Sequence, residues 1–235
     1  MTVSILCDVS FSVPDDCAAC VVRSSGFCNV SPEALEALNA VKLTALHPKG
    51  SILFGEGDMP RAVFILCAGR AKVMTSSAEG KTLIVRIAQG GEVLGVSATI
   101  LDEPYEVSAE TLEPMQVSII KRTDFLRLLH AHADLSLNAV RQLSAKYHAA
   151  QREIRSLGLA HNTAEKLARL LLEWCGAGSE VRMLYTHEEI AQMIGSTRET
   201  VTRVLGDFRH DNIIEVSGAS MTVLDRRALD AMIST

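Results

Sequence analysis

The chain has 235 residues, of which 48% are apolar, and a formal net charge of −5. The length exceeds one typical domain, the apolar content is sufficient for a sizeable core, and the charge argues neither for a membrane surface nor, globally, for nucleic acid as a partner. No apolar run is long enough to span a bilayer, and the N-terminal stretch MTVSILCDVS lacks the pattern of a signal peptide, so we expect a cytoplasmic protein of two domains.

Residues 1–30 form a cysteine-rich, loop-like segment. Cys17 and Cys20 make a Cys-x-x-Cys pair, Cys28 follows it, and Cys7 lies upstream. In a reducing cytoplasm, clustered cysteines more often bind a metal or act in catalysis than form disulfides. Four thiolates suit a [4Fe–4S] cluster, and the same four suit a structural zinc ion. A thiol–disulfide switch and a segment without any sensing role remain open as well.

Residues 31–122 are predicted to form an antiparallel β-roll preceded by a short helix. Ser31 is a suitable N-cap for that helix, and Pro32 suits its first turn. From Leu43 to Lys121, short runs of Val, Ile and Leu are separated by glycine-containing turns at intervals of roughly eight to twelve residues. This spacing is typical of an antiparallel sandwich or barrel.

Residues 123–159 are predicted to be helical. A short helix begins at Thr123 or Asp124, and the long helix that follows carries apolar residues at alternating spacings of three and four, which is an a/d seam. The seam consists of Val140, Leu143, Tyr147, Ala150, Ile154 and Leu157. A narrow, regular seam between two domains favours pairing with the same helix of a second subunit, although the helix could also pack on its own domain.

Residues 160–235 are predicted to form a winged helix-turn-helix domain. Two capping boxes, Thr186–Glu189 and Ser196–Glu199, would each begin a short helix. Gly195 ends the first of these helices, where a positive φ is cheap for glycine. Two apolar strands around Gly218 predict a wing behind the second helix.

The second short helix would be the recognition helix in the major groove of DNA. Four of its side chains are not on the apolar face and are free to point outward, and they are Arg198, Glu199, Thr202 and Arg203. An arginine can donate twice to guanine, and a glutamate can accept from cytosine. Hydroxyl groups near the helix N-termini suit phosphate contacts, and they belong to Thr186, Ser196, Thr197 and Thr200. The alternative role for Glu199 is the capping box, and that for the arginines is a solvated surface.

The order of β-roll, long helix and winged helix-turn-helix resembles the Crp/Fnr superfamily of bacterial transcription regulators over essentially the whole chain. GSTRETVTRVL resembles the recognition helix of the cyclic-AMP receptor branch, and GEVLGVSATI and AVFILCAGRAKV resemble its β-roll segments. The resemblance implies a homodimer, not an enzyme, that binds palindromic double-stranded DNA and contacts RNA polymerase. It also implies base reading by Arg198, Glu199 and Arg203.

The resemblance bears on the signal too. Val96 and Val107 replace the glutamate and arginine that hold cyclic AMP in that branch, and burying an unpaired phosphodiester is costly, so we expect no cyclic-AMP binding. The cysteines resemble those of the oxygen-sensing fumarate–nitrate branch, which binds a [4Fe–4S] cluster. Ser118 stands where that branch has a cysteine inside the roll. Cys7 is the natural substitute and Cys67 the second choice, Cys67 otherwise being a core residue.

We therefore predict an α+β regulator with an N-terminal β-roll, a long dimerisation helix and a C-terminal winged helix-turn-helix. It would sense oxygen, redox state or nitric oxide through a [4Fe–4S] cluster on Cys7, Cys17, Cys20 and Cys28. A small-molecule effector and direct thiol oxidation are alternatives within the same class. A protein-interaction module and a thiol oxidoreductase using Cys17 and Cys20 are alternatives from other classes, although the oxidoreductase motif normally begins a helix beside a βαβ unit.

Overall fold

The computed structural model describes residues 20, 22–159, 162–176, 178–182, 185–217 and 220–233. The chain divides into two compact units, which are Met1–Val73 with Ile87–Ser144, and Met74–Arg86 with Ala145–Thr235. Each unit is described by itself. The domain limits predicted at residues 30, 122 and 159 stay predictions.

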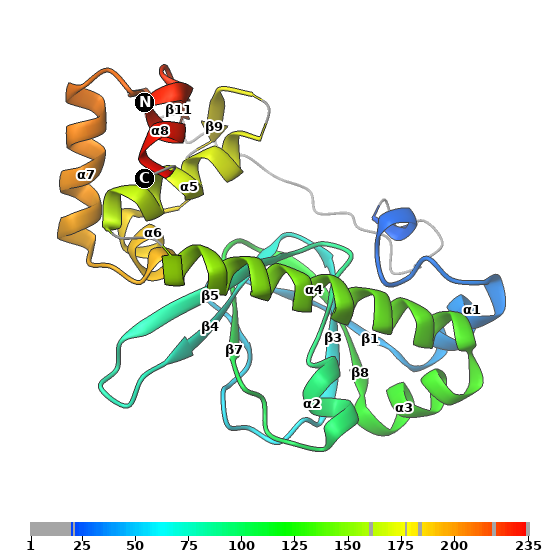
Figure 1. Cartoon of the computed structure of the whole chain (residues 1–235). Helices are drawn as coiled ribbons and strands as arrows, with labels where there is room; N and C mark the ends of the chain where they lie inside the picture. The colour runs from blue at the N-terminus through cyan, green and yellow to red at the C-terminus, as the bar shows by residue number, and fades with distance from the viewer. Residues whose placement is uncertain are drawn as a thin grey trace, which may run out of the picture. The chain divides into compact units, whose positions relative to one another are not determined.

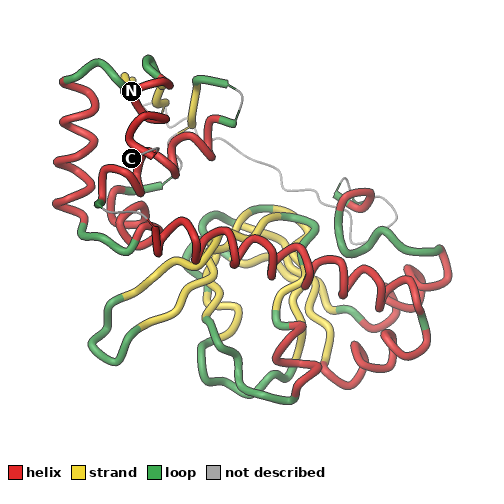
Figure 2. Tube along the Cα trace, in the orientation of Figure 1, coloured by secondary structure: helices red, strands yellow, loops and turns green. Residues whose placement is uncertain are grey.

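In the described residues, eight strands form two four-stranded sheets (Figure 1; Figure 2). The first sheet has the order β1-β8-β3-β6, and its strands are β1 (Leu43–His47), β8 (Met115–Lys121), β3 (Ala62–Ala68) and β6 (Val93–Leu94). The second has the order β2-β7-β4-β5, and its strands are β2 (Ile52–Phe54), β7 (Ser108–Thr111), β4 (Arg70–Ser76) and β5 (Thr82–Gln89). The pairs β1–β8, β3–β8, β3–β6 and β2–β7 are antiparallel, which confirms the predicted antiparallel roll.

Helices pack on this roll. They are the 3-10 helix η2 (Arg23–Ser25), α1 (Pro32–Val41), α2 (Val96–Leu101), α3 (Arg122–Ala131) and the long α4 (Ala133–Leu159). Helix α1 begins as predicted, because the Oγ of Ser31 accepts a hydrogen bond from the backbone N of Ala34 at 3.3 Å. Buried apolar residues of the N-terminal segment, α1, the first sheet, α3 and α4 form the first core. Its largest fully buried members are Phe27, Leu38, Ile120, Phe125 and Leu135.

Strand β3 is buried on both faces. Its alternate residues pack into two cores: Val63 and Ile65 into the first, and Phe64 and Leu66 into a second core of residues from both sheets. A strand covered on both sides needs a continuous apolar run, which AVFILCA supplies. The chain then turns at Gly69, whose φ is +85° and where a Cβ atom would lie 2.6 Å from a side-chain atom of β8. Only glycine fits there.

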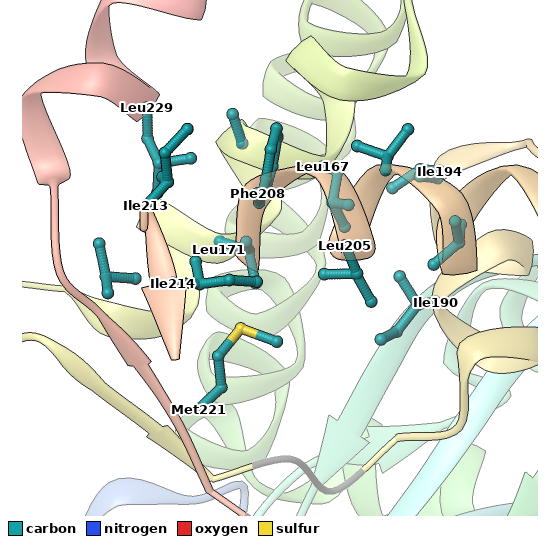
Figure 3. Close-up of a cluster of buried hydrophobic side chains, with 14 of the residues drawn as sticks. Leu167, Leu171, Ile190, Ile194, Leu205, Phe208, Ile213, Ile214, Met221 and Leu229 are labelled. Atoms are coloured by element: carbon teal, nitrogen blue, oxygen red, sulfur yellow. The ribbon is translucent and has the colours of Figure 1, made fainter. Parts of the chain in front are cut away.

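The second unit holds a winged helix-turn-helix, as predicted. Its elements are α5 (Thr163–Cys175), β9 (Glu180–Arg182), α6 (His187–Ile194), α7 (Arg198–His210), β10 (Ile214–Ser217), β11 (Ser220–Val223) and α8 (Arg226–Ile233). The three strands form a small sheet of order β10-β11-β9. Figure 3 shows that side chains from the helices and the wing converge on a common core, which includes Leu167, Leu171, Ile190, Ile194, Leu205, Phe208, Ile213, Ile214, Met221 and Leu229.

The two predicted capping boxes have different outcomes. The first is present: Glu189 N donates to Thr186 Oγ1 at 3.2 Å, and Thr186 N donates to Glu189 Oε2 at 2.7 Å. The helix ends at Gly195, with a φ of +62°. The second box, Ser196–Glu199, is wrong by one position, because the N-cap of α7 is Thr197.

The chain leaves Ser196 outside that cap for a structural reason. The backbone N of Ser196 donates to Ala191 O at 2.9 Å and completes the turn after α6, while its hydroxyl lies 3.3 Å from that of Thr163. The cap of α7 is made instead by Thr197 Oγ1, which accepts from Thr200 N at 3.3 Å. Glu199 is therefore not a capping residue.

Candidate functional site

Helix α7 presents one polar face because the core holds its other face. Val201, Val204, Leu205 and Phe208 are buried in the core of the second unit. The four predicted base-contacting side chains are all exposed, and they are Arg198, Glu199, Thr202 and Arg203. The core therefore determines which side chains of α7 are available to a partner.

Glu199 is accessible at the start of α7. The N-cap of α7 is formed by Thr197, whose hydroxyl accepts from the backbone N of Thr200. The Glu199 carboxylate is therefore not used in this cap and is available to bind a partner. A negative charge in the first turn also interacts favourably with the helix dipole. This geometry removes the interpretation that competed with base contact for Glu199.

Arg203 pairs within its own helix. Its Nη1 lies 3.1 Å from Asp207 Oδ2, and the two side chains are 67% and 58% exposed. An exposed pair at this spacing stabilises a helix by roughly 0.3–0.5 kcal/mol. A bidentate contact to a base discriminates by about 1–3 kcal/mol. Arg203 can therefore leave Asp207 for a base at small cost.

Thr202 is joined to the preceding helix. Its Oγ1 lies 2.9 Å from Nδ1 of His187, the first residue of α6. The hydrogen bond fixes the recognition face of α7 relative to the N-terminus of α6. Sequence analysis did not single out His187, although its position directly after the N-cap Thr186 was a usable signal.

The predicted phosphate-binding hydroxyls take part in caps and turns. Thr186 Oγ1 donates to Glu189 Oε2 at 2.9 Å, and the hydroxyls of Thr197 and Thr200 lie 3.0 Å apart. Thr186 and Thr197 are exposed. A hydroxyl has one donor and two acceptor sites, so a cap does not use its full capacity. Phosphate contact by these groups stays a prediction.

A second candidate site is a small pocket in the first unit that is lined by three cysteines. They are Cys20, Cys28 and Cys67, and Arg23 and Lys42 line the same pocket. Cys28 and Cys67 are each 8% exposed. We call this the thiol pocket. Of the other predicted ligands, Cys7 and Cys17 lie outside the described residues. Within the described part of the chain, no three His, Cys, Asp or Glu side chains are arranged to hold a single metal ion.

Helix α4 forms hydrogen bonds with the backbone on both sides of Cys28. The side-chain Nδ2 of Asn138 donates to Phe27 O at 3.3 Å and to Asn29 O at 2.7 Å. Its Oδ1 accepts from Arg141 Nη1 at 3.1 Å. Asn138 is buried, with 7% of its surface exposed. The position of Cys28 is thus tied to that of α4.

Asp134 and Gln142, four positions before and after Asn138, also form hydrogen bonds with the backbone of this unit. Their spacing places all three residues on the same face of α4. Asp134 Oδ2 accepts from Ser31 N at 2.6 Å, and this hydrogen bond lowers the pKa of the Asp134 carboxyl. Gln142 Nε2 donates to Gly91 O at 3.0 Å, and Gln142 Oε1 accepts from Val93 N at 3.0 Å. Gly91 also lines the thiol pocket. We call Asp134, Asn138 and Gln142 the polar stripe of α4.

The polar stripe was missed because only the apolar seam was sought. The seam residues Val140, Tyr147 and Ile154 are exposed, at 57%, 62% and 71%. Ala150 is exposed too, whereas Leu143 packs partly against the first core. The side chain of Leu157 lies outside the described residues. Leu137 adds an exposed apolar residue that the prediction did not include.

The positions predicted to matter for cyclic AMP lie inside the roll. Val96 is buried in the first core, and Val107 packs partly against the second. Ser108 Oγ accepts from Glu56 N at 2.9 Å. None of the helices in the described part of the chain is long and apolar enough to cross a membrane.

Comparison with known proteins matches two parts of the chain to known domain families. Residues 46–132 match the cyclic nucleotide-binding domain, and residues 165–232 match the Crp-like helix-turn-helix domain. The chain is 30% identical over 193 residues to a global nitrogen regulator of Synechocystis sp., covering 77% of this chain and 84% of that protein. It is 24% identical over 213 residues to the anaerobic regulatory protein of Bacillus subtilis, covering 88% and 90%.

A solved structure shows the same fold. The c-di-GMP responsive global regulator CLP of Xanthomonas campestris has a TM-score of 0.73 at 19% identity, covering 83% of this chain and 100% of that chain. The relatives named above are transcription regulators and not enzymes, in agreement with the prediction that this chain is not an enzyme. Together with the exposed face of α7, these matches show that the chain belongs to the Crp/Fnr family of DNA-binding transcription regulators.

Proposed function

We propose that this regulator acts in the cytoplasm as a homodimer on a palindromic DNA site, with RNA polymerase as a further partner. It responds to oxygen, redox state or nitric oxide through its N-terminal cysteines and not to cyclic AMP. The observation that carries this proposal is the pair of hydrogen bonds from Asn138 to the two carbonyl groups that flank Cys28. These bonds join a thiol-lined pocket to the helix that would form the dimer.

The exposed face of α7 supports sequence-specific reading of DNA. Arg198 and Arg203 would donate to guanine, and Glu199 would accept from cytosine. The hydroxyls at the N-termini of α6 and α7 would bind phosphate groups. Two-fold symmetry would place the half-sites one helical turn, roughly 34 Å, apart.

The exposed apolar residues of α4 support the dimer. Val140, Tyr147 and Ile154 follow one another at seven-residue intervals on one face. A soluble monomer rarely exposes several large apolar side chains in one row. Pairing with the same face of a second copy would bury them, with Ala150 completing the row.

The cysteines of the thiol pocket offer thiolates, which are the ligands that an iron–sulfur cluster takes. Cys20 and Cys28, eight positions apart in the N-terminal segment, both line this pocket. Arg23 and Lys42 line the pocket and would offset the negative charge of thiolates. The predicted ligands are these two cysteines with Cys17 and Cys7. When bound, a [4Fe–4S] cluster would supply a centre that reacts with oxygen and nitric oxide.

The polar stripe supports a route from the pocket to the dimer face. A buried carbonyl that loses its donor costs roughly 1–3 kcal/mol. A backbone change at Cys28 therefore either carries α4 with it or breaks the bonds to Asn138. The polar stripe lies on the side of α4 opposite Val140, Tyr147 and Ile154. A shift of α4 caused by a change in the thiol pocket would therefore also move the surface that contacts the partner subunit.

The first prediction concerns the sensor. Protein purified without air should contain about four iron atoms per chain and a broad absorbance band at about 400 nm, because the thiolates hold an iron–sulfur cluster. Exposure to air should remove the band and change DNA affinity in a gel shift. An iron-free protein whose DNA affinity still responds to oxidants would point to thiol oxidation instead. No response to either treatment would contradict redox sensing.

The second prediction concerns base reading. Arg203→Ala should weaken binding to the specific site by about 1–3 kcal/mol and relax the preference at one base pair, because a direct contact to a base is lost. Binding to a panel of single-base variants of the site measures both effects. Arg209→Ala, an exposed arginine in the last turn of α7, is the matched control. Equal loss on every sequence would show that Arg203 binds phosphate only.

The third prediction concerns the dimer. Val140→Glu should raise the dimer dissociation constant at least about tenfold, because a charge would be buried in an apolar contact. Sedimentation at several concentrations measures the constant. Ala149→Glu adds the same charge to an exposed position on the opposite face and should leave it unchanged. If both substitutions weaken the dimer equally, the apolar row is not the interface.

The fourth prediction concerns Asn138. Asn138→Asp keeps an acceptor for Arg141 but removes both donations to the Cys28 segment. The ratio of DNA affinities before and after air exposure should fall at least about fivefold, a coupling of about 1 kcal/mol. Asn29→Asp places the same charge in that segment and removes the hydrogen bond from Asn29 Nδ2 to Ser24 O, but it keeps the backbone carbonyl that Asn138 binds, so it should keep the wild-type ratio. A normal ratio in folded Asn138→Asp would exclude this route.

A further inference from the structure

The hydroxyl of Thr202 belongs to the recognition face of α7 and is also bonded to the preceding helix. Thr202 is exposed, and its Oγ1 lies 2.9 Å from Nδ1 of His187, the partly buried first residue of α6. A threonine hydroxyl within a helix often turns back to a carbonyl of its own preceding turn instead. This hydroxyl has a side-chain partner on another helix, and that partner limits what the hydroxyl can do on DNA.

The limit follows from the capacity of a hydroxyl, which has one donor and two acceptor sites. If Nδ1 of His187 carries no proton, the Thr202 hydroxyl donates to it and offers only acceptor sites to DNA. If Nδ1 carries a proton, the hydroxyl accepts from it and can donate to DNA. The position of the proton on the ring thus decides which hydrogen-bonding role Thr202 presents in the major groove.

The second ring nitrogen, Nε2, determines where that proton lies. In a neutral imidazole one nitrogen donates and the other accepts, and the partner of one nitrogen fixes the role of the other. Among the residues that the structure describes, the His187 ring has no second hydrogen-bond partner, so Nε2 is available to DNA. The first helix of a helix-turn-helix crosses the DNA backbone, and helix N-termini bind phosphate groups. A phosphate oxygen only accepts, so a phosphate at the N-terminus of α6 would keep the proton on Nε2 and leave Nδ1 as an acceptor.

A hydroxyl that can only accept selects an amino group. In the major groove cytosine and adenine present amino donors, whereas guanine presents the acceptors N7 and O6 and thymine presents the acceptor O4. A threonine without a fixed partner can bind either kind of base and discriminates poorly. With its proton directed to His187, the Thr202 hydroxyl can accept from cytosine or adenine but cannot donate to guanine or thymine.

We propose that His187 is a positioning residue that determines specificity: its Nδ1 accepts from the Thr202 hydroxyl, so that Thr202 selects cytosine or adenine over guanine or thymine. This inference rests on the proposed function, since it assigns a role at the same DNA-reading face. It adds a residue of α6 to the base-reading residues of α7. His187 would act through Thr202 and would not touch the base.

The test measures one ratio, which is the affinity for a site with cytosine at the position that faces Thr202, divided by the affinity for the same site with guanine there. The probe is a double-stranded DNA site that the wild-type protein selects from a random pool, changed in one half-site. The position is the one whose preference changes in Thr202→Val, which keeps the methyl group and loses the hydroxyl. The wild-type ratio should be at least about fivefold in favour of cytosine, the lower end of what a mismatched base pair costs.

The decisive variant is His187→Lys, because an ammonium group only donates. The Thr202 hydroxyl must then accept from the lysine and can donate to DNA, so the ratio should reverse in favour of guanine. In a Thr202→Val background, His187→Lys should leave the ratio unchanged, because no hydroxyl remains to be redirected. His210→Lys is the matched control, since His210 is an exposed histidine in the last turn of α7, and it should keep the wild-type ratio. Thermal unfolding checks that each variant folds.

The ratio separates this role from a merely structural one, which would weaken binding to every site equally. A folded His187→Lys protein with the wild-type ratio would overturn the inference, and so would a wild-type protein that favours guanine. An equal change of the ratio in the Thr202→Val background, or a Thr202→Val protein with unchanged preference at every base pair, would show that the effect does not pass through Thr202. A wild-type protein that selects no DNA site would instead remove the proposed function itself.

Discussion

The two hydrogen bonds from Asn138 to the carbonyls of Phe27 and Asn29 are the constraint on which the rest of the first unit depends. They join residues more than 100 positions apart in the sequence; the bond to Phe27 is buried, and the bond to Asn29 is partly buried. Breaking the buried bond leaves the Phe27 carbonyl without this donor, at a cost of roughly 1–3 kcal/mol. The Cys28 segment and the start of α4 consequently behave as one body.

That constraint gives α4 two different faces. The polar stripe binds the backbone of the cysteine segment and of the turn at Gly91, and the row that contains Val140 and Tyr147 faces away from it. Packed elements are not continuously deformable, so a shift on one side of a helix appears on the other. If the thiol pocket is the sensor and the apolar row is the dimer contact, as proposed, no further relay is needed between them.

The parts of the structure that depend on local chemistry could be predicted from the sequence. The cap at Thr186, the end of α6 at Gly195 and the continuous apolar run of β3 all follow from rules that span a few residues. The cap of α7 was misplaced by one residue because both Ser196 and Thr197 are good caps, and a tertiary contact to Thr163 decides between them. The role of Asn138 could not be predicted, since it depends on long-range packing. Cys67 was only the second choice as a partner of Cys20 and Cys28, because the packing that brings these three thiols to one pocket is also long-range.

The charge of the chain sets how its recognition helix can work. A protein with a net charge of −5 gains little from general attraction to phosphate groups, which is the sequence-independent part of DNA binding. Direct contacts to bases must therefore contribute a larger share of the affinity. Arg203, as a proposed base contact, fits this demand, because its exposed pair with Asp207 is weak enough to exchange for a bidentate contact to guanine. In that proposal, the acidic neighbour of the arginine favours discrimination between sites over tight binding to any DNA.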